Sequence, residues 1–239
     1  MGGIFLDQLS RHPAADGTPL HFLHQMEQLG AAVHGYMQAL AMAPTLPHAA
    51  PVADAVHLLT LLHHARPLLA HLVDHVVHRT HPHCAEPQAL AQWQAQVCAA
   101  LEEDRRWLMD LMLHFGPSPF VAARQSGEQK IHSLRRYIVT MLQSDRCDCA
   151  LGAMICLAQQ SDMLRLALNN GFAGTPLAHP ADGTPALRSA SHKLVLALIS
   201  GPLECPSRAR ALAFGVQQMA QLFTDLLTLL EARQAHGLP

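Results

Sequence analysis

The stretch 206–235 repeats apolar residues at alternating spacings of four and three. These positions hold Leu212, Val216, Met219, Phe223, Leu226 and Leu230. Because an α-helix makes one turn in 3.6 residues, this spacing places the six side chains on one face. A helix with such a seam buries it against other helices. The stretch therefore predicts a long helix in a helical bundle.

A second stretch, 147–169, is apolar around almost its whole circumference, which is typical of a helix at the centre of a fold. The composition of the whole chain agrees, since 50% of its residues are apolar and only 14% are charged. Leu and Ala dominate the apolar set and favour helices over strands. We therefore expect an all-α protein.

Capping and breaking residues divide the chain further. Thr18-Pro19 and Thr184-Pro185 each predict a helix start, because Thr caps a helix and Pro suits its first position. We expect seven helices, at about 19–43, 54–83, 88–115, 119–144, 147–169, 186–200 and 206–235. No internal linker is long or polar enough to divide the chain, so residues 1–239 are expected to form a single domain. In outline this architecture resembles ferritin-like and haem-oxygenase-like bundles.

Charge and hydropathy argue against several classes of partner. The formal net charge is −2 and the arginines are sparse, so no nucleic-acid surface is expected. The first residues lack the features of a signal peptide, and no window approaches the roughly 18 apolar residues that span a bilayer. Six cysteines without a disulfide framework favour a cytoplasmic protein with reduced thiols. The net charge of −2 also gives no reason to expect binding to an anionic membrane.

The most unusual stretch is 54–83, which carries eight of the eighteen histidines. Its regularly spaced members form a column along one side of the predicted helix: His57, His64, His71, His75 and His78. Pro67 is expected to kink or break the helix within this column, because proline removes a backbone hydrogen bond. The group after the kink, His71, His75 and His78, has the spacing of transition-metal ligands.

A metal site in a bundle also needs ligands from other helices. Two pairs of matching type lie at the borders of apolar faces: Glu27 with His34, and Glu128 with His132. Carboxylates and histidines that project into a bundle hold iron or manganese in di-metal proteins. The sequence therefore offers an iron, manganese or zinc site as one hypothesis. It lacks the Glu-x-x-His pair of ferritin-like proteins, and haem binding or ordinary half-buried histidines are alternatives.

Asp162 is a carboxylate on the otherwise apolar stretch 147–169. A buried carboxylate needs a partner, since an unpaired buried charge is costly. Arg135 and Arg136 are candidate partners, with Arg165 one turn away. The structural interpretation is a buried ion pair. The functional one is a ligand or cofactor pocket formed by Asp162, Arg135 and Gln159.

On the predicted helix 88–115, four polar or aromatic residues line up opposite the apolar face: Glu103, Trp107, Asp110 and His114. We interpret this line as a solvated stripe. The sequence contains no phosphate-binding loop and no hydrolase motif, so no enzymatic reaction is indicated.

Two functional hypotheses follow. The first is a helical-bundle protein that binds a metal ion, cofactor or small molecule in an internal pocket lined by histidines and carboxylates. The second is a non-catalytic protein that forms homo-oligomers through apolar and His-lined helix faces. The sequence favours a homo-oligomer under either hypothesis but identifies no substrate.

Overall fold

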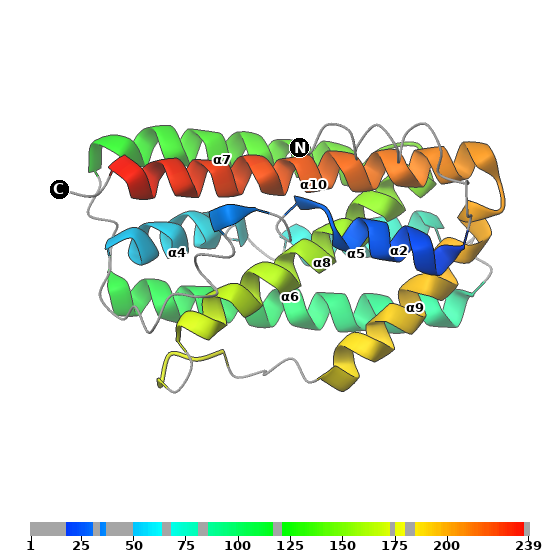
Figure 1. Ribbon diagram of the computed structural model, residues 1–239, viewed down its shortest axis with the longest axis horizontal. Helices are drawn as coiled ribbons and strands as arrows, with labels where there is room; N and C mark the ends of the chain where they lie inside the picture. Colours follow the sequence, from blue (N-terminus) through cyan, green and yellow to red (C-terminus); the bar gives the residue numbers. More distant parts are fainter. Residues whose placement is uncertain are drawn as a thin grey trace.

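A computed structural model of the chain describes residues 18–30, 34–36, 50–63, 68–80, 86–116, 121–172, 175–179 and 185–236. These residues form eight α-helices and no strand, packed into one compact body (Figure 1). The helices are α2 (Pro19–Glu27), α4 (Ala50–His63), α5 (Leu68–Thr80), α6 (Pro87–Phe115), α7 (Val121–Leu142), α8 (Cys147–Gly171), α9 (Pro185–Leu203) and α10 (Pro206–His236). The predicted all-α class is confirmed.

Helix α8 crosses the middle of the molecule. Figure 1 shows it running obliquely between α7 and α10 along one edge and α6 along the other. It contacts α5, α6, α7 and α10, and every residue from Cys149 to Leu157 is buried. The central position predicted from its apolar circumference is confirmed.

The seam of α10 is also confirmed, because all six of its predicted positions are buried. Its main neighbour is α8, and two glycines set how closely the helices approach. A Cβ atom added to Gly152 would overlap the carbonyl oxygen of Leu212, and one added to Gly215 would overlap that of Cys149. The two backbones are therefore in direct contact at these points.

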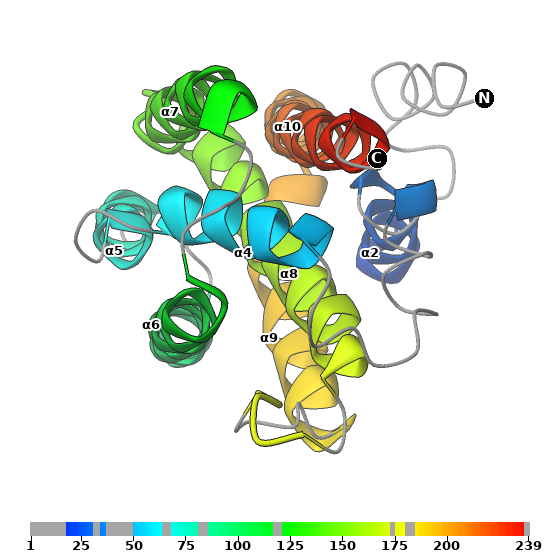
Figure 2. The ribbon, with the colours of Figure 1, turned by 90° about the vertical axis from the view of Figure 1, so that its left-hand side faces the viewer.

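The His-rich stretch is two helices, α4 and α5, as the break expected near Pro67 requires. Pro67 itself and His64 lie outside the described residues. In the view of Figure 2, α4 lies near the centre of the body and α5 lies at its side. The apolar faces of both helices are buried, including Leu58, Leu62 and Leu72.

The helix predicted over 19–43 is much shorter than expected. Helix α2 is capped by the Thr18 hydroxyl, as predicted, but it ends at Glu27. Gly30 then adopts a φ of 60°, a conformation that favours glycine. The turn is held against α8 because the side-chain amide of the fully buried Gln160 donates a hydrogen bond to the carbonyl oxygen of Leu29 at 3.2 Å.

The other helices follow their predicted bounds within a few residues. Helix α9 continues through Pro202 to Leu203, beyond the end predicted near residue 200. Within the described residues, none of the helices has the length and apolar character needed to cross a membrane.

Candidate functional site

The most unusual feature of the core is a group of ionisable side chains, which we call the Asp104 cluster: Asp104, Arg165, His179 and Asp162. The guanidinium Nε of Arg165 lies 3.2 Å from Oδ1 of Asp104, and Nε2 of His179 lies 3.3 Å from the same oxygen. The side chains of Asp104, Arg165 and His179 are only 7%, 11% and 1% exposed. Asp162, at 33% exposure, binds Arg165 from the same helix. The Arg165 guanidinium therefore forms ion pairs with the carboxylates of both Asp104 and Asp162.

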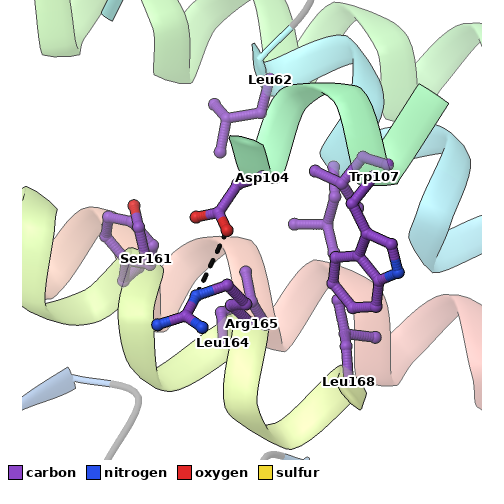
Figure 3. A pocket seen from close by; sticks show the side chains of 10 residues that line it. Leu62, Asp104, Trp107, Ser161, Leu164, Arg165 and Leu168 are labelled. Atoms are coloured by element: carbon purple, nitrogen blue, oxygen red, sulfur yellow. Dashed lines mark ion pairs between the residues drawn. The ribbon is translucent and has the colours of Figure 1, made fainter. Parts of the chain in front are cut away.

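A small cavity lies beside this cluster, between α4, α6, α8 and α10. Its volume is about 20 Å³, room for about one water molecule. Figure 3 shows the Asp104 carboxylate pointing from α6 toward Arg165 on α8, with the Ser161 side chain to the left of Asp104 and Trp107 to the right. The remaining wall is mostly apolar and contains Leu59, Leu62, Trp107, Leu108, Leu164, Leu168 and Phe223.

The segment 175–179, which we call the cover segment, lies against the cluster. The indole Nε1 of Trp107 donates a hydrogen bond to the carbonyl oxygen of Leu177 at 2.8 Å. The backbone N–H of His179 donates to Oδ1 of Asn169 at 2.6 Å. The rings of Trp107 and His179 meet edge to face with their centroids 4.9 Å apart. The cover segment therefore contacts two residues of the cavity wall, Asp104 and Trp107.

Local sequence explains why Asp104 faces inward. It stands in the apolar register of α6, between the buried residues Val97, Leu101, Leu108 and Leu111. A helix places residues at these spacings on one face, so the carboxylate enters the core with its apolar neighbours. A charged residue in a core register was the signal for this site, and the prediction from sequence missed it.

The prediction of a solvated stripe on α6 is wrong at one position. Glu103 is half-buried, and Asp110 and His114 are exposed as expected, whereas Trp107 is buried. Trp107 turns inward because Leu177 accepts the hydrogen bond from its indole and because Phe172 and His179 contact its ring. The sequence around Trp107 gives no sign of these partners, which come from elsewhere in the chain.

The predicted ligand pocket of Asp162, Arg135 and Gln159 corresponds only in part to this site. Asp162 contacts this site through Arg165, which is one of its candidate partners. Arg135 on α7 and Gln159 on α8 are half-buried and do not line the cavity. Asp104 is the more deeply buried carboxylate.

The structure places the residues of the predicted metal site at separate points. On α5, His75 and His78 are exposed, and the side chain of His71 lies outside the described residues; His132 on α7 is exposed as well. His34 lies 3.3 Å from the hydroxyl of Thr228 on α10.

The two predicted carboxylate ligands each have a different histidine partner. Glu128 lies 3.2 Å from Nε2 of the buried His57, and Glu27 lies 3.0 Å from Nε2 of His192 on α9. Among the described residues, no group of three or more His, Cys, Asp or Glu side chains is arranged to hold a metal ion.

These features define a class: an all-helical protein whose core encloses a charged cluster beside a small cavity. The chain belongs to DUF6975, a family of unknown function, which matches residues 26–236. No curated protein and no solved structure matches the chain.

Proposed function

We propose that this protein binds a small polar molecule at the cavity beside the Asp104 cluster. The observation that carries the proposal is the burial of Asp104 and Arg165 at the wall of a cavity, with His179 packed against Asp104. Removing charged groups from water is costly, and apolar residues of similar volume often give equal or greater stability. A buried charged cluster at a cavity is therefore a candidate for function.

In this proposal, the structure shows the closed state of the cavity, with the cover segment in place. At about 20 Å³ it admits about one water molecule, so a larger ligand needs additional space. The cover segment can supply it, because His179 and Leu177 contact the wall residues Asp104 and Trp107. Displacement of the cover segment would expose a carboxylate, a hydroxyl and an indole to an entering molecule.

A small organic ligand is favoured over a metal ion. Metal ions need several converging ligand atoms, whereas the described histidines and carboxylates of the predicted metal set lie on separate surfaces. The Asp104 cluster has one imidazole and an arginine whose positive charge opposes a cation bound directly at Asp104.

Ligand-observed NMR on the full chain tests this proposal with four small probes of one size: butylammonium, butyrate, butyramide and 1-butanol. At least one probe is expected to bind saturably at millimolar concentration. Ser161→Leu, which fills the cavity, should abolish that binding. Ser133→Leu, a matched change at an exposed position of α7, should leave it intact. Absence of binding by all four to the wild type, or equal binding to Ser161→Leu, overturns the proposal.

A second candidate function is homo-oligomerisation through the surface shared by α7 and α10. Phe214 on α10 is 51% exposed and Tyr137 on α7 is 40% exposed. The hydroxyl of Tyr137 donates to Oε1 of Gln218, one turn after Phe214, so the two rings belong to one surface. Exposed aromatic side chains are enriched in protein interfaces.

Light scattering after size-exclusion chromatography tests this candidate. A dimer that dissociates on Phe214→Ser but persists on Leu113→Ser supports it, because Leu113 is exposed on α6. A monomeric wild type, or a dimer unaffected by Phe214→Ser, rejects it.

A further inference from the structure

The wall of the cavity beside the Asp104 cluster indicates the chemical class of the ligand. We infer that the bound molecule is a small neutral amide with an apolar tail. Its N–H group donates to the carboxylate of Asp104, and its carbonyl oxygen accepts from the hydroxyl of Ser161, since both residues line the cavity. The inference rests on the proposed function and adds a ligand class to it.

The charged side chains at the wall favour a head group without charge. Asp104 and Arg165 both line the cavity, and Oδ1 of Asp104 lies only 3.2 Å from Nε of Arg165. A cationic head group at the carboxylate would therefore lie close to the guanidinium, and an anionic one at the guanidinium would lie close to the carboxylate. Like charges repel strongly at such distances where little water screens them. A neutral head group avoids both repulsions.

Asp104 and Ser161 together offer an acceptor and a donor to this head group. The closest contacts of Arg165 and His179 to Asp104 both fall on Oδ1. Figure 3 shows the other carboxylate oxygen on the side of Asp104 where Ser161 lies. A carboxylate only accepts hydrogen bonds, whereas a hydroxyl can donate one. An amide carries the matching N–H and carbonyl groups side by side.

The cover segment already presents these two kinds of group to the residues of the wall. The backbone carbonyl oxygen of Leu177 accepts the indole N–H of Trp107 at 2.8 Å. Two residues later, Nε2 of His179 lies 3.3 Å from Oδ1 of Asp104. The closed state thus pairs a carbonyl oxygen and a nitrogen with the wall. A ligand that displaces the cover segment would offer the same pair of groups in its place.

The rest of the wall selects the tail of the ligand. It is mostly apolar, with side chains from α4, α6, α8 and α10: Leu59, Leu62, Leu108, Leu164, Leu168 and Phe223. A chain of a few methylene groups buries its surface favourably there. A tail with further polar groups would leave them against these leucines without hydrogen-bond partners.

Butyramide and 2-pentanone test the inference, because they have nearly the same shape and a methyl group in the ketone replaces the amide nitrogen. Butyramide is expected to bind the full chain roughly tenfold more tightly, since only its N–H group donates to Asp104. Butylammonium and butyrate, whose head groups are charged, should also bind more weakly than butyramide. Ligand-observed NMR measures the four affinities under the same conditions.

A pair of serine variants tests the place of the head group. Ser161→Ala keeps the space of the cavity but removes the hydroxyl, so it should weaken butyramide binding by about fivefold. Ser133→Ala, which removes an exposed hydroxyl from α7, should leave the affinity for butyramide unchanged.

The outcomes separate this inference from the proposed function. Binding of 2-pentanone, butylammonium or butyrate at the cavity as tightly as butyramide leaves the proposed function standing and overturns the amide class. An affinity for butyramide that is unchanged in Ser161→Ala also overturns the inference. Absence of binding by every probe overturns both.

Discussion

Gly215 of α10 lies directly against the carbonyl oxygen of Cys149 of α8, with no room for a side chain between the two helices. Gly152 makes the reciprocal contact, against the carbonyl oxygen of Leu212. The central helix and the longest helix are therefore joined backbone to backbone. This close approach holds α8, which carries Ser161 and Arg165, in register with α10.

Alanine at either glycine should destabilise the fold. The added methyl group meets backbone atoms, which cannot rotate away, so Gly215→Ala and Gly152→Ala are each expected to lower the free energy of unfolding by about 3 kcal/mol. Gly171→Ala is the control, because nothing lies within 4 Å of its added Cβ. Its effect should stay within about 1 kcal/mol. Urea denaturation measures all three, and equal stability of the three variants would contradict the close approach.

Removal of the Asp104 carboxylate should also be costly. Asp104→Ala removes a buried carboxylate that lies against both Arg165 and His179, so a loss of about 3 kcal/mol in the free energy of unfolding is expected. Asp110→Ala, on the exposed side of α6, should change stability by no more than about 0.5 kcal/mol. Thermal and urea unfolding provide the comparison. Similar stability of the two variants would mean that Asp104 is not held in a buried ion cluster.

The helices of the core were predictable because helical periodicity is a local property. The spacing of apolar residues in α10 and the apolar circumference of α8 each predict burial without knowledge of any partner. Even Asp104 could have been found, since it interrupts the apolar register of α6.

The partners of these residues were not predictable in the same way. Periodicity fixes where His75 or Glu128 stands around its own helix, but not which neighbouring helix that face meets. Glu128 was expected to meet histidines of α5 and instead lies beside His57 of α4. His179 comes from a segment without periodicity, so nothing in the sequence links it to Asp104 or Trp107.

The reactivity of the cysteine thiols tests the local structure at the start of α10. The Ser207 hydroxyl, followed by the backbone N–H groups of Arg208 and Ser207, lowers the pKa of the Cys205 thiol at the start of α10. Burial raises the pKa of Cys156, and burial with nearby Asp74 raises that of Cys98 to about 11. A lower pKa gives more thiolate at neutral pH, and the thiolate is the reactive form.

Iodoacetamide should therefore modify Cys205 well before Cys98 or Cys156 at pH 7.5, as judged by peptide mass spectrometry. The rate of Cys205 modification should rise over a lower pH range than the rate for an ordinary thiol. Ser207→Ala removes the largest cause of the lowered pKa, so the midpoint of this rise should move to higher pH. An unchanged pH profile in Ser207→Ala would refute this assignment.

The indole N–H of Trp107 reports most directly on whether the cover segment closes a ligand site. It donates to Leu177, whereas the chain's other tryptophan, Trp93, is buried on α6 outside the cavity wall and supplies an internal reference. In a ¹⁵N NMR titration with a butyl probe that binds the full chain, the Trp107 indole resonance is expected to shift saturably while that of Trp93 stays in place. Binding of the probe that leaves the Trp107 resonance unmoved would contradict a site beneath the cover segment.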